Sequence, residues 1–381
     1  MSRVLRLGYI PLVDAAAAIV ATEFGFADEE GIKLELVRAN SWSMLRDQLD
    51  FGQVEAAHML SVMPVARALG LGSGDQPIEA LMVLSLNGQI FGLSSKLPPL
   101  PFGDPARVGQ ALGELGRPLR IGVPFPFSMQ AELLAYWLDR VGGGIRVDIR
   151  TVPPPRMAKA LLADEIDGFC VGEPWGSHAV EQAGARLVLP GSAIWSQAPE
   201  KVLAVRKGWA EARPDMAGKL MRALWRASRW VGDASNRTTL AEVLSRPGYL
   251  DVSPDLIDRA LSQRLLIAPE GPEIPIRQFQ TFHTGLANFP WRSQAAWIGA
   301  RLAQRNGLDV GTAMQQARDL FRSDLYRQHI GPTGAPLPRC SDKVEGALAA
   351  SETVAAVHGA LILDRNQFFD GQVFDPEQLA S

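Results

Sequence analysis

The sequence predicts an α/β protein with two lobes. Its 381 residues exceed the roughly 250–300 residues at which a single hydrophobic core stops growing. Short apolar runs alternate with amphipathic or alanine-rich runs, which is the order of strands and helices in an α/β sheet. A segment with four prolines between Pro98 and Pro105 separates two such series, because proline at that density interrupts strands and helices.

The first series predicts a mainly parallel sheet. Strands are expected at Leu5–Ile10, Ile32–Val37, Ala56–Leu60 and Leu81–Leu86. Asp14 and Ser41 are the expected N-caps of the helices that follow the first two strands, since both are residue types that accept from free backbone N–H groups. This βαβαβ order favours parallel pairing, because each helix returns the chain to the same edge of the sheet.

The second series predicts another sheet and then a helical region. Strands are expected at Leu119–Val123, Ile145–Val152, Ile166–Val171, Arg186–Leu189 and Lys201–Val205. Helices are expected from Ser128 to Val141 and over Met157–Ala163. From Pro214 onward we expect mainly helices, since Asp215–Val231 repeats apolar residues three and four positions apart.

Composition excludes several classes of function. Thirty-eight basic and 41 acidic residues give a net charge of −3, so no basic surface for direct contact with nucleic acid is expected. No apolar run reaches the roughly 20 residues of a membrane-spanning helix, and the N-terminus resembles a strand more than a signal peptide. We therefore expect a cytoplasmic protein without a membrane partner.

Chemical motifs are missing as well. The nucleotide-binding, zinc-protease and serine-hydrolase patterns do not occur, and the five histidines contain no pair at helical spacing that would ligate a metal. The two cysteines, Cys170 and Cys340, have neither metal-finger nor disulfide-framework spacing. The sequence thus predicts a protein that is not an enzyme and has no metal or cofactor.

Polar residues instead gather where strands end and helices begin. Ligands of α/β sheets bind outside the carboxyl ends of the strands. Candidate binding residues at such points are Trp42, Gln89, Gln130, Gly172 and Lys201. A lysine, two amides, an indole N–H and a helix N-terminus are all donors, so together they predict an anion site.

Each candidate taken alone has a structural alternative. Trp42 is typical of core packing, Gln89 of a turn and Lys201 of a solvated surface. Four other features are expected to be structural: Glu173 braces a loop, Cys170 and His58 fill the interior, and three arginines form a solvated helix face (Arg222, Arg226 and Arg229). Only the combination of donors favours binding over packing.

Eight motifs in order resemble the nitrate/bicarbonate-binding proteins of the NrtA/CmpA family. They are GYIPLVDAAA, ANSWSMLRDQL, AAHMLSVMP, LNGQIFGLS, VPPPRM, GFCVGEPW, IWSQAPEK and FFDGQVFDP. The resemblance extends from about Leu5 to Pro376 and implies the type II periplasmic-binding-protein fold, with a ligand cleft between lobes. It also implies a discontinuous first lobe, residues 1–95 plus 206–381 with the C-terminal helices, and a second lobe, residues 96–205.

The resemblance implies a ligand as well. In the family, the oxyanion is held by residues that match Trp42, Gln89, Gly172 and Lys201, and by a histidine where this chain has Gln130. Bicarbonate binders of the family carry an acidic residue in place of the lysine and use calcium. Lys201 therefore favours nitrate or nitrite, and Gln130 retains a donor but removes a titratable group.

A cytoplasmic member of this kind resembles the nitrate/nitrite sensor of the NasS type. That resemblance implies a NasT-type antiterminator partner, which contacts RNA in place of this chain and is released when the anion binds. Two alternatives stay open. One is the substrate-binding protein of a nitrate ABC transporter, and the other is an enzyme on the same fold, such as a pyrimidine-precursor synthase, which would need clustered histidines or a reactive cysteine.

Overall fold

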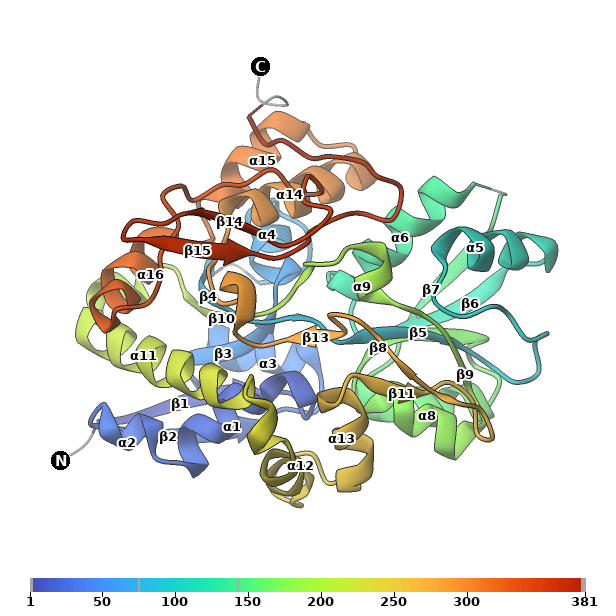
Figure 1. The fold of residues 1–381 in the computed structure, drawn as a ribbon, viewed down its shortest axis with the longest axis horizontal. Coiled ribbons are helices and arrows are strands. Elements are labelled where there is room, and N and C mark those ends of the chain that lie inside the picture. The colour runs from blue at the N-terminus through green and yellow to red at the C-terminus, as the bar shows by residue number, and fades with distance from the viewer. Residues whose placement is uncertain (1–2, 75, 143, 378–381) are drawn as a thin grey trace.

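Two β-sheets organise the molecule (Figure 1). The computed structural model describes residues 3–74, 76–142 and 144–377, so the ends of the expected first lobe lie outside it. The larger sheet has six strands in the order β13-β4-β10-β3-β1-β2. The smaller has five, in the order β7-β6-β8-β5-β9. This confirms the predicted two-lobed α/β architecture.

The six-stranded sheet is built mainly from the first series of apolar runs. Its strands are β1 (Arg3–Tyr9), β2 (Ile32–Arg38), β3 (Ala56–Leu60), β4 (Ile78–Asn87), β10 (Pro199–Arg206) and β13 (Gln280–Thr281). Strand β1 pairs in parallel with both β2 and β3, as the βαβ order predicts. Strand β10 runs antiparallel to β3 and β4, because the chain enters it from the other lobe.

The five-stranded sheet forms the second lobe. Its strands are β5 (Gln89–Leu93), β6 (Leu119–Val123), β7 (Val147–Thr151), β8 (Gly168–Gly172) and β9 (Arg186–Pro190). Strand β6 pairs in parallel with β7 and β8, whereas β5 is antiparallel to β8 and β9. Gly92, Gly122 and Gly168 lie on these strands where an added Cβ would meet a neighbouring side chain at 3.0 Å or less, so the sheet packs closely at these points.

The two crossings between the sheets differ from the predicted lobe boundaries. Strands β4 and β5 follow one another with only Gly88 between them, yet belong to different sheets. On the return, the whole of β10 belongs to the first sheet. The chain therefore crosses at Gly88 and just before Pro199, and not at residues 95/96 and 205/206. The proline-rich segment, which suggested a crossing, lies within the second lobe.

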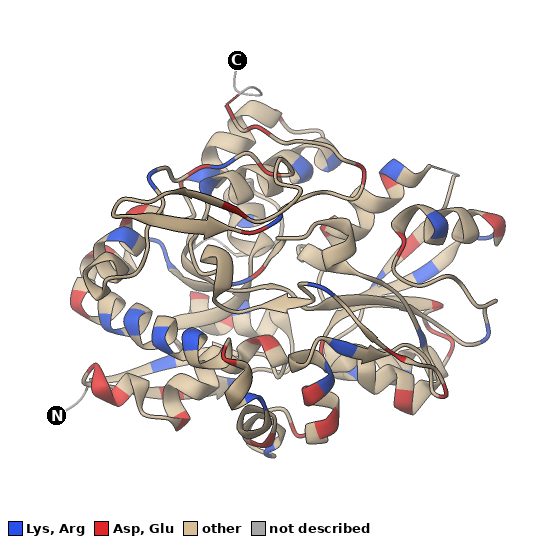
Figure 2. Cartoon of the chain, viewed as in Figure 1, with Lys and Arg blue, Asp and Glu red and all other residues tan. Residues whose placement is uncertain are grey.

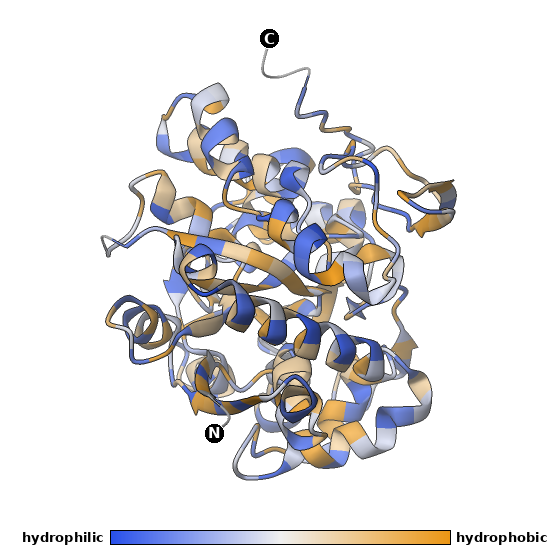
Figure 3. Ribbon diagram, turned by 90° about the vertical axis from the view of Figure 1, so that its left-hand side faces the viewer, coloured by the Kyte–Doolittle hydropathy of each residue, from blue (hydrophilic) through white to orange (hydrophobic). Residues whose placement is uncertain are grey.

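Helices cover the faces of both sheets. They are α1 (Ala16–Glu23), α2 (Phe26–Glu29), α3 (Trp42–Asp50), α4 (Val62–Ala68), α5 (Pro105–Glu114), α6 (Met129–Val141), α7 (Met157–Leu162), α8 (Trp175–Ala183), α9 (Gly191–Ile194), α10 (Trp209–Ala212), α11 (Pro214–Val231), α12 (Arg237–Ser245), α13 (Pro254–Leu261), α14 (Arg292–Asn306), α15 (Val310–Arg318) and α16 (Ser323–Ile330). Figure 3 shows hydrophilic and hydrophobic residues alternating along them, which is typical of helices with one buried face.

The C-terminal region is less uniformly helical than the sequence predicts. Besides α11–α16 it contains two small antiparallel pairs, β11 (Arg264–Leu266) with β12 (Glu273–Pro275) and β14 (Glu352–Ala355) with β15 (Ala360–Leu363). It also touches the second lobe, where Arg305 of α14 pairs with the buried Glu132 of α6. The region thus braces both lobes, and in the described chain no helix is long and apolar enough to cross a membrane.

Figure 2 shows a row of basic residues along α11. We expected these arginines to form a solvated helix face. Two of them instead form ion pairs with Glu30, Arg222 at 2.7 Å and Arg226 at 2.9 Å. The third, Arg229, stacks its guanidinium 5.1 Å from the ring centroid of Trp225. The two ion pairs attach α11 to the N-terminal part of the chain, because Glu30 is the C-cap of the short helix α2, whereas Trp225 lies on α11 itself.

Candidate functional site

The five predicted binding residues lie where the two lobes meet. Trp42 is the first residue of α3, Gln130 the second of α6 and Gln89 the first of β5. Gly172 ends β8 and pairs in register with Gln89, while Lys201 lies in β10 opposite Leu60 of β3. All five are buried, and the four with side chains are at most 1% exposed. The predicted alternative of a solvated Lys201 is therefore wrong.

Two serine caps fix where the helices of the site begin. The Ser41 hydroxyl accepts a hydrogen bond from the Met44 N–H at 3.2 Å, and Ser128 accepts one from the Ala131 N–H at the same distance. Both serines have extended backbone dihedral angles, as N-caps do. Each cap starts its helix one or two residues before a candidate side chain, so local sequence determines where Trp42 and Gln130 emerge.

Lys201 is the centre of a buried charged network. Its ammonium nitrogen Nζ lies 2.7 Å from Asp14 Oδ2 and donates to Glu200 Oε1. It also lies 5.4 Å from the ring centroid of Trp42, within the range of a cation–π contact. On the far side of Asp14, Nε2 of His58 lies 3.0 Å from Oδ1.

Sequence reasoning missed the role of Asp14. We expected it to cap the first helix, but neither α1 nor the preceding 3-10 turn Val13–Ala15 has a side-chain cap. Its carboxylate is 2% exposed and turns inward to Lys201 instead. The available signal was a lone carboxylate placed directly after a strand and before the apolar run AAAAIV, where a buried charge needs a partner.

Direct contacts between the lobes surround this network. Gln130 Nε2 of the second lobe donates to Glu200 Oε1 of the first sheet at 2.6 Å. The Val13 N–H donates to the carbonyl oxygen of Glu173 at 2.9 Å, and the Trp175 indole N–H donates to that of Pro11 at 2.8 Å. The structure is therefore one in which the two lobes are in contact around the candidate site.

The shifts in pKa follow from these contacts. Burial would raise the pKa of Asp14, but Lys201 and His58 outweigh it, and the pKa is lowered. For Lys201, burial opposes the charged form, yet the carboxylates of Asp14 and Glu200 raise the pKa overall. Burial dominates for the other two groups and lowers the pKa of His58 while raising that of Glu200. At neutral pH the network thus contains an ionised Asp14–Lys201 pair and a neutral imidazole.

Several buried polar atoms of the site have no hydrogen-bond partner. The indole Nε1 of Trp42 and both amide atoms of Gln89 are among them, as is Nδ1 of His58. Most buried donors in proteins are satisfied, because an unpaired one costs the free energy of its lost hydration. The Lys201 ammonium carries three N–H groups, two of which point to carboxylates. The site can therefore donate to a small acceptor through Trp42, Gln89 and Lys201.

Close backbone packing shapes the same place. A Cβ added to Gly191 would lie 2.6 Å from the amide nitrogen of Gln89, so Gly191 leaves room for that side chain. A Cβ added to Gly172 would lie 3.1 Å from Cδ2 of Leu12, so Gly172 lets Leu12 pack closely.

Two of the residues expected to be structural, Glu173 and Cys170, behave accordingly. Glu173 accepts from the Ser177 N–H at 3.1 Å, which braces the turn into α8, and burial raises its pKa to about 7. Cys170 lies buried inside β8, and burial raises the pKa of its thiol.

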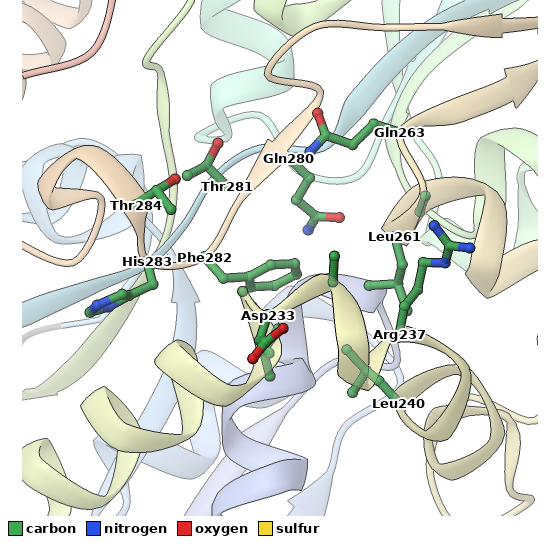
Figure 4. A pocket seen from close by; sticks show the side chains of 14 residues that line it. Asp233, Arg237, Leu240, Leu261, Gln263, Gln280, Thr281, Phe282, His283 and Thr284 are labelled. Atoms are coloured by element: carbon green, nitrogen blue, oxygen red, sulfur yellow. The ribbon is translucent and has the colours of Figure 1, made fainter. Parts of the chain in front are cut away.

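A separate cavity lies beside the Gly88 crossing (Figure 4). It measures about 150 Å³ and is bounded by the end of α11, by α12, by α13 and by β13. Gln280 of β13 is 5% exposed and packs on Gly88, where an added Cβ would lie 2.8 Å from the Gln280 Cδ atom. None of the five candidate residues lines this cavity, so it is distinct from the network around Lys201.

Comparison with known proteins agrees with this architecture. The fold is that of the two-lobed periplasmic-binding-protein class. The chain belongs to the NMT1-like family, which matches residues 2–245. The resemblance seen in the eight sequence motifs is thereby confirmed, whereas the finer resemblance to cytoplasmic sensors stays a prediction.

Individual relatives extend the comparison. The chain is 29% identical to the nitrate/nitrite binding protein NrtA of Nostoc sp., over 98% of this chain and 83% of the relative. It is 33% identical to the nitrate import ATP-binding protein NrtC of Synechocystis sp., over 86% of this chain but only 50% of that relative. The crystal structure of the periplasmic nitrate-binding protein NrtA from Synechocystis PCC 6803 superimposes with a TM-score of 0.86 and 25% identity, covering 99% of this chain and 97% of that one.

Proposed function

We propose that this protein binds nitrate or nitrite between its lobes and reports the anion to a partner. The observation that carries the proposal is the set of unpaired buried donors, Trp42 Nε1 and the Gln89 amide, together with the Lys201 ammonium, which lies 5.4 Å from the ring centroid of Trp42. Both anions accept hydrogen bonds through each of their oxygens and remain ionised near neutral pH. Charge-assisted hydrogen bonds contribute about 1.5–3 kcal/mol each, so a few of them suffice for a micromolar site.

The choice of anion rests on Lys201. Relatives named for nitrate or nitrite and one named for bicarbonate transport all match more than nine tenths of the chain, whereas the presence of Lys201 favours nitrate or nitrite under the family resemblance. This chain has Gln130 at the position where the family has a histidine, and the Gln130 amide donates a hydrogen bond to Glu200. Under this proposal Gln130 contributes by holding the lobes together as well as by facing the anion.

The first experiment is a calorimetric titration with nitrate, with nitrite and with bicarbonate plus calcium. We expect saturable binding of nitrate or nitrite and no heat from bicarbonate. Trp42→Phe removes one indole N–H and keeps most of the packing, so it should weaken binding about tenfold or more. The matched control is Trp209→Phe, because Trp209 Nε1 is also buried without a partner but lies in α10. Equal affinities of the two variants would remove Trp42 from the site.

The role of the anion is proposed to be regulatory. A cytoplasmic NasT-type antiterminator would bind the open lobes, and anion binding would favour the closed lobes and release it. A ligand shifts such an equilibrium only by its difference in affinity for the two states.

The alternative is the substrate-binding protein of a nitrate ABC transporter. It is favoured by the 0.86 TM-score to a periplasmic nitrate-binding protein. Pull-down of the antiterminator by the tagged chain, with and without nitrate, separates the two roles. Nitrate at about 1 mM saturates the site, because this concentration is far above a micromolar Kd. Capture that nitrate abolishes supports the sensor. Capture that nitrate leaves unchanged, or capture of the transporter subunits alone, would exclude it.

A further inference from the structure

Glu200 occupies the position of an internal anion within the candidate site. Its Oε1 atom accepts from both Lys201 and Gln130, two of the side chains assigned to the bound anion. The residue is fully buried, and its second oxygen, Oε2, has no hydrogen-bond partner. An incoming nitrate or nitrite therefore meets a carboxyl group that already uses the same donors.

The titratable groups around Glu200 lie on β10, β3 and β8 and in the turn after β1. Lys201 of the same strand contributes one positive charge, and Asp14 after β1 contributes one negative charge. His58 of β3 is neutral at pH 7, because burial lowers its pKa, and the Cys170 thiol of β8 stays protonated. With Glu200 ionised the cluster would carry one net negative charge.

A bound monoanion would bring that total to two negative charges in a buried place. Burying an uncompensated charge is costly, and proteins usually avoid it by changing the protonation of a group. Asp14 is a poor acceptor for a proton, because Lys201 and His58 both stabilise its ionised form. Glu200 is the remaining carboxyl group.

We infer that Glu200 takes up one proton when the anion binds, so that the site binds an anion and a proton together. The proton comes from solvent and adds to a Glu200 carboxylate oxygen, and no bond of the anion is broken. The neutral acid no longer competes as a charge for Lys201 and Gln130, and its O–H can donate to the anion. The direction of the pKa shift, raised by burial, agrees with this assignment.

This inference rests on the proposed function, and one experiment tests the two separately. Nitrate is titrated by calorimetry from pH 6 to pH 9.5 in pairs of buffers that differ in ionisation heat, which yields the number of protons taken up per anion. We expect uptake to approach one above the pKa of Glu200 in the free protein. There the Kd should rise about tenfold per pH unit.

Glu200→Gln should remove both effects, because an amide cannot take up the proton, so that its nitrate affinity should be the same at every pH of the range. The matched control is Glu345→Gln: Glu345 is also fully buried with a raised pKa, but it contacts Ser293, Lys343 and Asn366. A wild-type Kd that is constant across the range, or proton uptake that persists in Glu200→Gln, would overturn the inference. Absence of nitrate binding at every pH would instead overturn the proposed function.

Discussion

Lys201 Nζ lies 2.7 Å from Asp14 Oδ2, and both side chains are almost completely removed from solvent. The pair joins β10 to the turn that follows β1, two segments nearly two hundred positions apart in the sequence. The charge of Lys201 is thus compensated before any ligand arrives. An anion at this site meets an oriented N–H group of a buried ion pair and not a free cation, which makes the uncharged donors more important.

Replacing Lys201 by alanine should abolish anion binding and destabilise the fold. Asp14 would remain buried without its partner, and breaking one side of a buried ion pair costs about 3–5 kcal/mol. Urea unfolding measures the stability and calorimetry the binding. Lys33→Ala is the control, because Lys33 pairs with Glu35 at an exposed position. Wild-type nitrate affinity in the Lys201 variant would contradict the proposed site.

His58 should make stability depend on pH below neutrality. Its pKa is lowered in the folded state, so the unfolded chain binds the proton more readily. The stability that the neutral His58 imidazole contributes is fully present above its unfolded-state pKa of about 6.5. It is lost as the pH falls toward the lower pKa of His58 in the folded state. His58→Gln should reduce the slope of unfolding free energy between pH 7 and pH 5.

The slope should be reduced and not removed, because burial also lowers the pKa of His178, His283 and His329. His358→Gln, on the exposed turn between β14 and β15, is the control. An unchanged slope in the His58 variant would show that the imidazole is protonated equally in both states.

Gly88→Ala should strain the crossing between the lobes. Gly88 has φ of +90°, and its added Cβ would lie 2.8 Å from Cδ of Gln280. We expect a loss of about 1–3 kcal/mol in unfolding free energy. Gly103→Ala is a matched control: Gly103 has φ of +83°, but an added Cβ would meet nothing within 4 Å. If both variants lose the same free energy, the contact with Gln280 adds nothing to the backbone strain.

Gln130→Ala should loosen the contact between the lobes. It deletes the 2.6 Å hydrogen bond to Glu200, and bonds to charged groups contribute about 1.5–3 kcal/mol. Small-angle X-ray scattering without ligand should then show a larger radius of gyration. Gln110→Ala is the control, since Gln110 is an exposed residue of α5 whose amide donates to Glu114 of the same helix at 3.2 Å. Identical scattering from both variants would mean that other contacts hold the lobes.

Much of the fold could be predicted because it depends on local patterns. Ser41 and Ser128 cap the helices that the sequence assigns to them, and the apolar runs of both series form the strands. The crossing at Gly88 could not be predicted in this way. The mainly apolar run from Ala80 to Leu93 is broken by Ser85 and by Asn87 to Gln89, and only pairing with different neighbours assigns its two halves to different sheets.

The five candidate residues were found from their positions at strand and helix ends, and the fold brings them to one place. Asp14 and Glu200 were not found, because burial and partners decide what a carboxylate does.

The sequence by itself determined most strands of the two sheets, the helix starts at Ser41 and Ser128 and the donors of the candidate site, since each depends on residue type and spacing within a few positions. Only the tertiary structure decided that Lys201 is a buried member of a network with Asp14, Glu200 and Gln130. The physical reason is that charge compensation acts through space over a few ångströms, and the partners of Lys201 are brought that close by the packing of two sheets.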